Sequence, residues 1–143
     1  MTSIWLVLTN PYAYDQALSF AVEEAQKIEA ELRVVFFIEA EGLQTMVGEL
    51  SERGWYGPGS LQNLQKTMLE GYRALAGDVL KRVKRKAAPI SVVDEGVVEQ
   101  PSLDKYIGTL IKEPMEKLII SSANLPNAEL DSLLDKIDWI TEG

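Results

Sequence analysis

Cysteine and histidine are both absent from the 143-residue chain. Their absence excludes disulfide bonds, Cys/His zinc sites, thiol nucleophiles and Ser-His-Asp triads. A domain of roughly 150 residues buries about 70% of its unfolded surface, so it can fold without such cross-links. With 46% hydrophobic and 25% charged residues, the composition is that of an ordinary globular protein, and we expect one domain over residues 1–143.

Positive charge is scarce: 14 Lys and Arg stand against 22 Asp and Glu, for a net charge of −8. Because phosphate binding needs a Lys/Arg surface, this balance argues against general nucleic-acid binding. Five cations nevertheless cluster within residues 81–86, which leaves nine cations against 22 acidic residues, a net charge of −13, elsewhere. We interpret this cluster either as a helix C-terminus, where cations meet the helix dipole, or as a patch for RNA or another anionic partner. No aromatic residues interleave with it, which weakens the second interpretation.

Long hydrophobic runs are also missing. No apolar stretch approaches the ~20 residues of a membrane span, and the first residues lack the basic and apolar regions of a secretion signal. We therefore expect no membrane association and a cytoplasmic location.

Short apolar runs alternate with amphipathic stretches along the chain. The runs predict buried strands at residues 4–8, 32–38, 90–93 and 118–120. Helical spacing of apolar residues predicts a first helix that runs to the second strand, with Asn10 as its N-cap and Pro11 as its first residue. The same spacing predicts helices over residues 60–83, 101–111 and 130–140. This alternation predicts an α/β fold, an open parallel sheet of four strands, or five, with helices on both faces.

Residues 39–60 interrupt the alternation. A short helical turn runs into the glycine-rich residues 53–60, and long irregular segments of compact domains are often binding loops. We interpret this insertion, Gly42–Gly59, either as a lid over a ligand site or as a mobile connection whose Trp55 and Tyr56 pack on the domain. Its glycines do not form a phosphate loop, since GxxxxGK[ST] is absent.

Ligands of doubly wound sheets bind outside the carboxyl ends of the strands, where the strand order reverses. For a strand order of 3-2-1-4, this point lies between the first and fourth strands. The residues expected to line it are Thr9, Asn10, Ile38, Ser121, Ser122 and Asn124. They can hydrogen-bond a ligand, but none is a general base or nucleophile as it stands, so we predict no catalytic residue and no metal site. Asp94 and Glu95, which we expect to close the third strand, are the nearest candidates for acid–base or metal chemistry.

Several segments resemble the universal stress protein family. Residues 14–39 are similar to the first helix and second strand of that family. Glu95-Gly96, residues 101–111 and residues 116–122 are similar to the end of its third strand, its third helix and its fourth strand. The resemblance implies an α/β domain, ATP or AMP as a ligand, and a dimer.

The chain departs from the family at the nucleotide site. Members that bind nucleotides carry an Asp after the first strand, where this chain has Thr9-Asn10, and a Gly-x2-Gly-x9-Gly-Ser/Thr loop after the fourth strand. Here residues 121–128 follow, and no glycine occurs between Gly108 and Gly143. Without glycine, close approach of the backbone to a phosphate is sterically harder. The predicted terminal helix also replaces the family's fifth strand, which we expect to be missing.

These features favour a non-enzymatic, universal-stress-like protein that acts in stress response or regulation by protein interaction, with a degenerate nucleotide cleft and no cofactor. The alternative is a divergent ATP or AMP sensor that uses the crevice between strands one and four. A small enzyme is a third hypothesis, for which the chain supplies no activated nucleophile. Without a fifth strand, the fourth would be a sheet edge. The apolar face of residues 130–140 would cover that edge within the chain, or dock on a second copy to form a homodimer or on a protein partner.

Overall fold

The computed structural model describes residues 2–52, 58–124, 126 and 137–142. Strands and helices alternate along most of the chain, as the sequence predicts. The elements in chain order are β1 (Ser3–Leu8), α1 (Asp15–Ile28), β2 (Glu31–Glu39), α2 (Ala40–Glu52), α3 (Pro58–Lys86), β3 (Val92–Gln100), α4 (Leu103–Leu110), β4 (Lys117–Ser122) and β5 (Ile137–Thr141).

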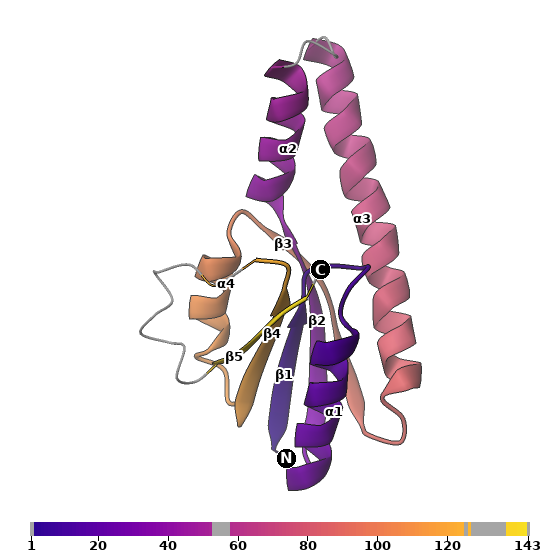
Figure 1. Ribbon diagram of the computed structural model, residues 1–143, viewed down its shortest axis with the longest axis vertical. Helices are drawn as coiled ribbons and strands as arrows, with labels where there is room; N and C mark the ends of the chain where they lie inside the picture. Colours follow the sequence, from indigo (N-terminus) through magenta and orange to yellow (C-terminus); the bar gives the residue numbers. More distant parts are fainter. Residues whose placement is uncertain (1, 53–57, 125, 127–136, 143) are drawn as a thin grey trace.

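The strands form one parallel sheet in the order β3-β2-β1-β4-β5. Helices α1 and α3 cover one face and α4 covers the other (Figure 1). The predicted α/β architecture is therefore confirmed, and the first four strands have the order 3-2-1-4 that we assumed in placing the site. No helix in the described ranges has the length and apolar character that a membrane span needs.

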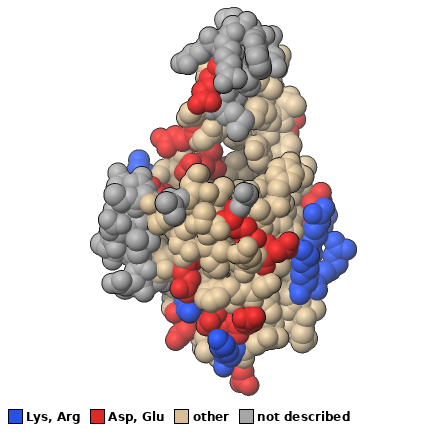
Figure 2. Space-filling view, viewed as in Figure 1, with Lys and Arg blue, Asp and Glu red and all other residues tan. Residues whose placement is uncertain are grey.

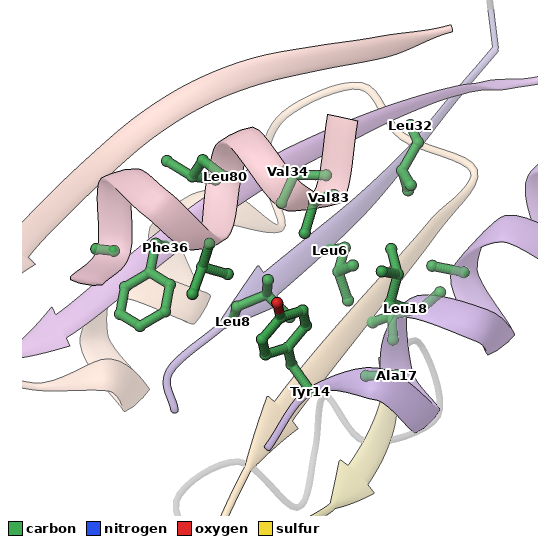
Figure 3. Close-up of a cluster of buried hydrophobic side chains, with 14 of the residues drawn as sticks. Leu6, Leu8, Tyr14, Ala17, Leu18, Leu32, Val34, Phe36, Leu80 and Val83 are labelled. Carbon is green, nitrogen blue, oxygen red and sulfur yellow. The ribbon is translucent and has the colours of Figure 1, made fainter. Parts of the chain in front are cut away.

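Strand β1 lies at the centre of the sheet and is buried on both faces. All six of its residues are buried. Ile4, Leu6 and Leu8 face α1 and α3 in the larger core cluster (Figure 3), and Trp5 and Val7 face α4 in the second one. This two-sided burial explains why β1 is an unbroken apolar run, without the alternation of a half-exposed strand.

The first helix begins later than the sequence predicts. It starts at Asp15, and Asn10 forms a local turn in place of the predicted N-cap: its Oδ1 accepts a hydrogen bond from the Tyr12 N–H at 2.9 Å. Asn side chains commonly bond the backbone two residues on, and this alternative competes with helix capping. The turn keeps residues 9–12 at the carboxyl end of β1.

The third strand is longer than predicted because Asp94-Glu95-Gly96 forms a bulge and does not end it. Val34 pairs with Asp94 and Val35 with Gly96, so Glu95 is the extra residue. Gly96 has φ +86°, which a glycine adopts without strain, and its N–H donates to Asp94 Oδ1 at 2.8 Å. Turn-forming residues thus kink the strand, which continues to Gln100.

The prediction of a helix over residues 130–140 is wrong where it can be compared. Ile137–Thr141 is a strand, paired in parallel with β4 from Leu118–Ile137 to Ser122–Thr141, while residues 127–136 lie outside the described part. We expected the fifth strand to be missing, but it is present, and β4 is therefore not a sheet edge. Short apolar runs fit both periodicities, and here the β-branched and aromatic residues of 137–141 favour the strand.

The insertion at residues 39–60 is more helical than predicted. Helix α2 occupies Ala40–Glu52, and the 29-residue α3 begins at Pro58. The two helices run side by side and extend beyond the end of the sheet (Figure 1). Residues 53–57, which include Trp55 and Tyr56, lie outside the described part, and the lid role of this insertion stays a prediction.

An ion-pair network connects α1, β4 and β5. Lys117 Nζ lies 3.3 Å from a Glu24 carboxylate oxygen and 3.1 Å from Asp138 Oδ2. The hydrogen bond to Asp138 raises the pKa of Lys117 against the effect of burial. Burial works to raise the pKa of Glu24, but the hydrogen bond and charge of Lys117 outweigh it and lower that pKa below its ordinary value. The network thus favours the charged forms of these groups in the folded protein.

We predict that Lys117→Met lowers the free energy of unfolding near neutral pH and has less effect in acid. Because the pKa of Glu24 is lower in the folded protein than in the unfolded chain, its charged form stabilises the fold at pH values above the ordinary carboxylate pKa. This contribution is lost as the pH falls below about 4. It is also lost at high pH, as Lys117 deprotonates. Urea denaturation at several pH values measures the difference, with Lys112→Met, a change at an exposed lysine, as the control. An equal loss at neutral and acid pH would contradict the prediction.

Candidate functional site

A cavity of about 670 Å³ opens at the carboxyl ends of β1, β2 and β4. Its volume lies in the roughly 300–1,000 Å³ range of ligand pockets. The cavity is where the strand order predicts a site, because the connection after β1 leads to β2 and the connection after its neighbour β4 leads the opposite way, to β5. The described lining residues are Thr9, Asn10, Pro11, Tyr12, Phe36, Phe37, Ile38, Glu39, Gly42, Leu43, Tyr72, Leu103, Asp104, Ser122, Ala123, Asn124 and Trp139.

Five of the six residues expected at this site line the cavity. They are Thr9, Asn10, Ile38, Ser122 and Asn124. The sixth, Ser121, is fully buried, and its hydroxyl has no hydrogen-bond partner among the described residues. Successive side chains of a strand point to opposite faces, so Ser122 reaches the cavity and Ser121 points to the α1 side of β4. The structure thus brings five of these residues together, and their ligand stays a prediction.

The polar groups of the cavity are largely occupied by contacts within the chain. The Thr9 hydroxyl donates to the Ser121 carbonyl at 2.7 Å, which ties the loop after β1 to β4. Ser122 Oγ accepts the Asn124 N–H at 3.2 Å, and the Asn124 carbonyl accepts the indole N–H of Trp139 at 2.9 Å. These bonds hold the walls of the cavity in place and leave fewer groups to bind a ligand.

Aromatic and acidic residues, which the sequence did not point to, complete the lining. Tyr12 lies on the loop after β1, whereas Tyr72 and Trp139 come from α3 and β5. Tyr12 directly follows the predicted crevice residues and could have been found from the sequence. Tyr72 could not, because it occupies an ordinary apolar position of an amphipathic helix, and Trp139 could not, because its segment was predicted to be a helix and forms β5.

The charge of the cavity is negative. Glu39 and Asp104 are the charged residues of the described lining, which contains no lysine or arginine. Both carboxylates stand at the carboxyl-terminal side of the sheet, Glu39 at the end of β2 and Asp104 in the first turn of α4. A phosphate group placed here would meet repulsion from both carboxylates, with no cation in the described lining to offset it.

Carboxylates of the chain also occupy the N-termini of two helices: α4, whose first residues line the cavity, and α1, which follows the lining residues 9–12 in the chain. Glu142, directly after β5, accepts the N–H groups of Gln16 and Ala17 in the first turn of α1, at 3.0 and 3.3 Å. Glu39 accepts the Leu103 N–H of α4 at 2.9 Å. Free N–H groups at a helix N-terminus are a common anion-binding site. In this chain such groups of α1 and α4 are already bound to anions.

The acidic pair Asp94-Glu95 does not belong to this cavity. Asp94 holds the bulge of β3, and Glu95 pairs with Arg33, which also pairs with Glu31. Both acidic residues lie in the middle of β3, where they have structural partners. We expected them at the carboxyl end of this strand. Within the described residues, no group of three or more acidic side chains is arranged to hold a metal ion.

Comparison with solved structures finds a similar fold. A universal stress protein from Archaeoglobus fulgidus superposes with a TM-score of 0.56 and 13% sequence identity, over 100% of this chain and 94% of that one. At this identity the likeness shows the fold alone. The chain therefore has the α/β fold of a universal stress protein.

Searches by sequence give no further match. No model of a known protein family matches the chain. No curated protein matches it either.

We predict that Glu142→Ala destabilises the fold by about 1 kcal/mol, the usual effect of removing an N-terminal helix cap. The reason is that α1 loses the acceptor of two N–H groups, which is also one of the contacts between α1 and the end of β5. Chemical denaturation measures the change. Glu113→Ala, which removes an exposed carboxylate, is the matched control and should change stability by less than about 0.5 kcal/mol. Equal effects of the two substitutions would show that the cap contributes nothing.

Proposed function

We propose that this protein is a non-enzymatic, universal-stress-like protein that acts in stress response or regulation by binding other proteins, with a cleft that no longer accepts nucleotide phosphates. The observation that carries this proposal is the occupation of the helix N-termini by Glu39 and Glu142. Anionic side chains stand where an anionic ligand would bind, and the described cavity lining adds Asp104 and no cation.

The shape of the cavity supports the proposal only in part. The fold keeps a crevice at the reversal point of the strand order, but its Thr9 and Ser122 hydroxyls bond to backbone groups, and the Trp139 indole bonds to the Asn124 carbonyl. The glycine loop that carries phosphates in nucleotide-binding family members is absent from the sequence after β4. Close backbone approach to a phosphate is hindered wherever a Cβ stands in place of glycine.

We predict no micromolar binding of ATP, ADP, AMP or cyclic nucleotides in calorimetric titrations of the wild-type protein. We also predict that Glu39→Gln gains measurable affinity for AMP, because an amide oxygen can still accept the Leu103 N–H while the negative charge is removed. Glu113→Gln, which removes the same charge from an exposed position, should gain none. Micromolar binding by the wild-type protein would overturn the proposed loss of nucleotide binding.

A divergent ATP or AMP sensor is the second candidate function. It is favoured by the size of the cavity and by the convergence of Asn10 and Ser122 on its wall. For such a sensor we expect Asn10→Ala and Ser122→Ala to weaken a nucleotide affinity that the wild-type protein displays in the same titrations. The complete absence of nucleotide binding by the wild-type chain would remove this candidate.

We also propose a homodimer, on a different basis from the one that the sequence offered. Strand β4 lies between β1 and β5, so the outer strand on this side is β5, whose outer edge pairs with no described strand. Unpaired strand edges are commonly covered or paired. Light scattering at tens of micromolar should give twice the mass of the chain. A monomeric mass at that concentration would contradict the proposal.

A further inference from the structure

The basic cluster of the sequence lies at the C-terminal end of α3, on the side that faces solvent. Lys81, Arg82, Lys84, Arg85 and Lys86 are all exposed, whereas Val83 between them is buried. Figure 2 shows the largest group of blue atoms along this flank, while red atoms are scattered over the rest of the face. The cations that cluster in the sequence are therefore also clustered on the surface.

Four of these cations have no carboxylate partner in the described structure. Lys86 Nζ bonds Asp15 Oδ1 at 3.0 Å and lies 5.3 Å from the centre of the Tyr14 ring. No ion pair within the described ranges involves the other four side chains. We call these four the basic patch: Lys81, Arg82, Lys84 and Arg85.

The basic patch covers one side of the helix over little more than one turn. At 3.6 residues per turn its four side chains span an arc of about 160°, and their Cα atoms span about 6 Å along the axis. The opposite side of this turn carries the buried Val79, Leu80 and Val83. The cations therefore form a compact convex surface and do not converge on one point, as a site for a single phosphate would require.

Interaction with the helix dipole explains only part of the cluster. That interaction is confined to the last turn, which contains Lys84 and Arg85, whereas Lys81 and Arg82 stand earlier. Like charges three and four residues apart, as in Lys81 and Arg85, repel each other and destabilise a helix. A helix that needed only a favourable C-terminus would be more stable without the earlier pair.

We infer that the basic patch binds an acidic segment of a partner protein, one with several Asp or Glu residues over one or two turns of helix or a short extended stretch. This inference rests on the proposed function, because it takes the partner to be a protein. A long nucleic acid fits less well: its phosphates would run past a patch of this length, and the rest of the chain carries a net charge of −12. The patch also has no aromatic residue on which bases could stack.

The test is fluorescence anisotropy with a labelled seven-residue glutamate peptide, about two turns of helix. Its controls are the same peptide with glutamine in every position and a single-stranded RNA of equal charge. We expect the glutamate peptide to bind in a salt-dependent manner, more tightly than the RNA, and the glutamine peptide not to bind. Binding through exposed charges weakens as salt screens them.

Two matched double variants locate the binding. K81E/R85E should weaken glutamate-peptide binding by about tenfold or more, since ion pairs are lost and repulsions gained. K105E/K112E makes the same change in net charge at exposed positions on the α4 side of the sheet and should change binding by less than about threefold. K81Q/R85Q, which adds no repulsion, should give an intermediate loss, and circular dichroism checks that each variant is folded.

Three outcomes would overturn the inference: no binding of the glutamate peptide, equal losses in the two charge-reversal variants, or tighter binding of the RNA. Equal losses would indicate a net-charge effect, and tighter RNA binding would indicate a nucleic-acid surface. Calorimetry with nucleotides on the same preparation keeps the tests apart. Nucleotide binding bears on the cleft of the proposed function, and peptide binding bears on the basic patch alone.

Discussion

The burial of β1 on both faces and along both edges is the constraint on which the rest of the structure depends. An all-apolar strand of this kind must be paired on each side and covered above and below, so the chain places β2 and β4 beside it, α1 and α3 on one face and α4 on the other. The connection after β1 leads to β2 and the connection after β4 leads to β5, so the two lead away from each other at the carboxyl ends of these neighbouring strands. The cavity at its carboxyl end is a consequence of that divergence, before any ligand is considered.

Two carboxylates at the ends of strands bind helix N–H groups of the chain itself. Glu39 and Glu142 bind helix N–H groups from within, one from the end of β2 and one from the end of β5. Each contact stabilises a helix through the same electrostatics that could have held an anionic ligand. Capping by these carboxylates and binding of an external anion would use the same few N–H groups. In the described structure the carboxylates of Glu39 and Glu142 occupy them.

Charge is distributed in a way that separates two kinds of surface. The described cavity lining is acidic and red atoms are scattered over the visible face, while the largest basic group lies on the outer side of α3 (Figure 2). Both features follow from simple rules: carboxylates gather where helix N-termini need acceptors, and cations gather near a helix C-terminus. The cations of α3 exceed that second requirement, because Lys81 and Arg82 lie outside the last turn.

Much of the fold could be predicted from the sequence, because the strands are short apolar runs and the helices have a clear apolar stripe. The first four strands and most of the helices follow from these local patterns, whereas the order of the strands in the sheet had to be assumed. The predictions that failed concern residues whose local preference fits two structures. Asp94-Glu95-Gly96 has the composition of a turn but forms a bulge, because the residues of β3 before and after Glu95 both pair with β2. Residues 137–141 read as the end of a helix and form β5, because β4 offers a pairing edge.

The candidate site divides in the same way. By itself the sequence determined that Thr9, Asn10, Ser122 and their neighbours would meet, since they follow strands whose carboxyl ends must share one edge of a parallel sheet. Only the tertiary structure decided the charge and the closure of that site. Glu142 reaches α1 across more than 120 residues of sequence, and Trp139 reaches the loop after β4 because β5 pairs there. Periodicity reports which side of an element is buried, whereas contacts between distant elements depend on the complete packing of the chain.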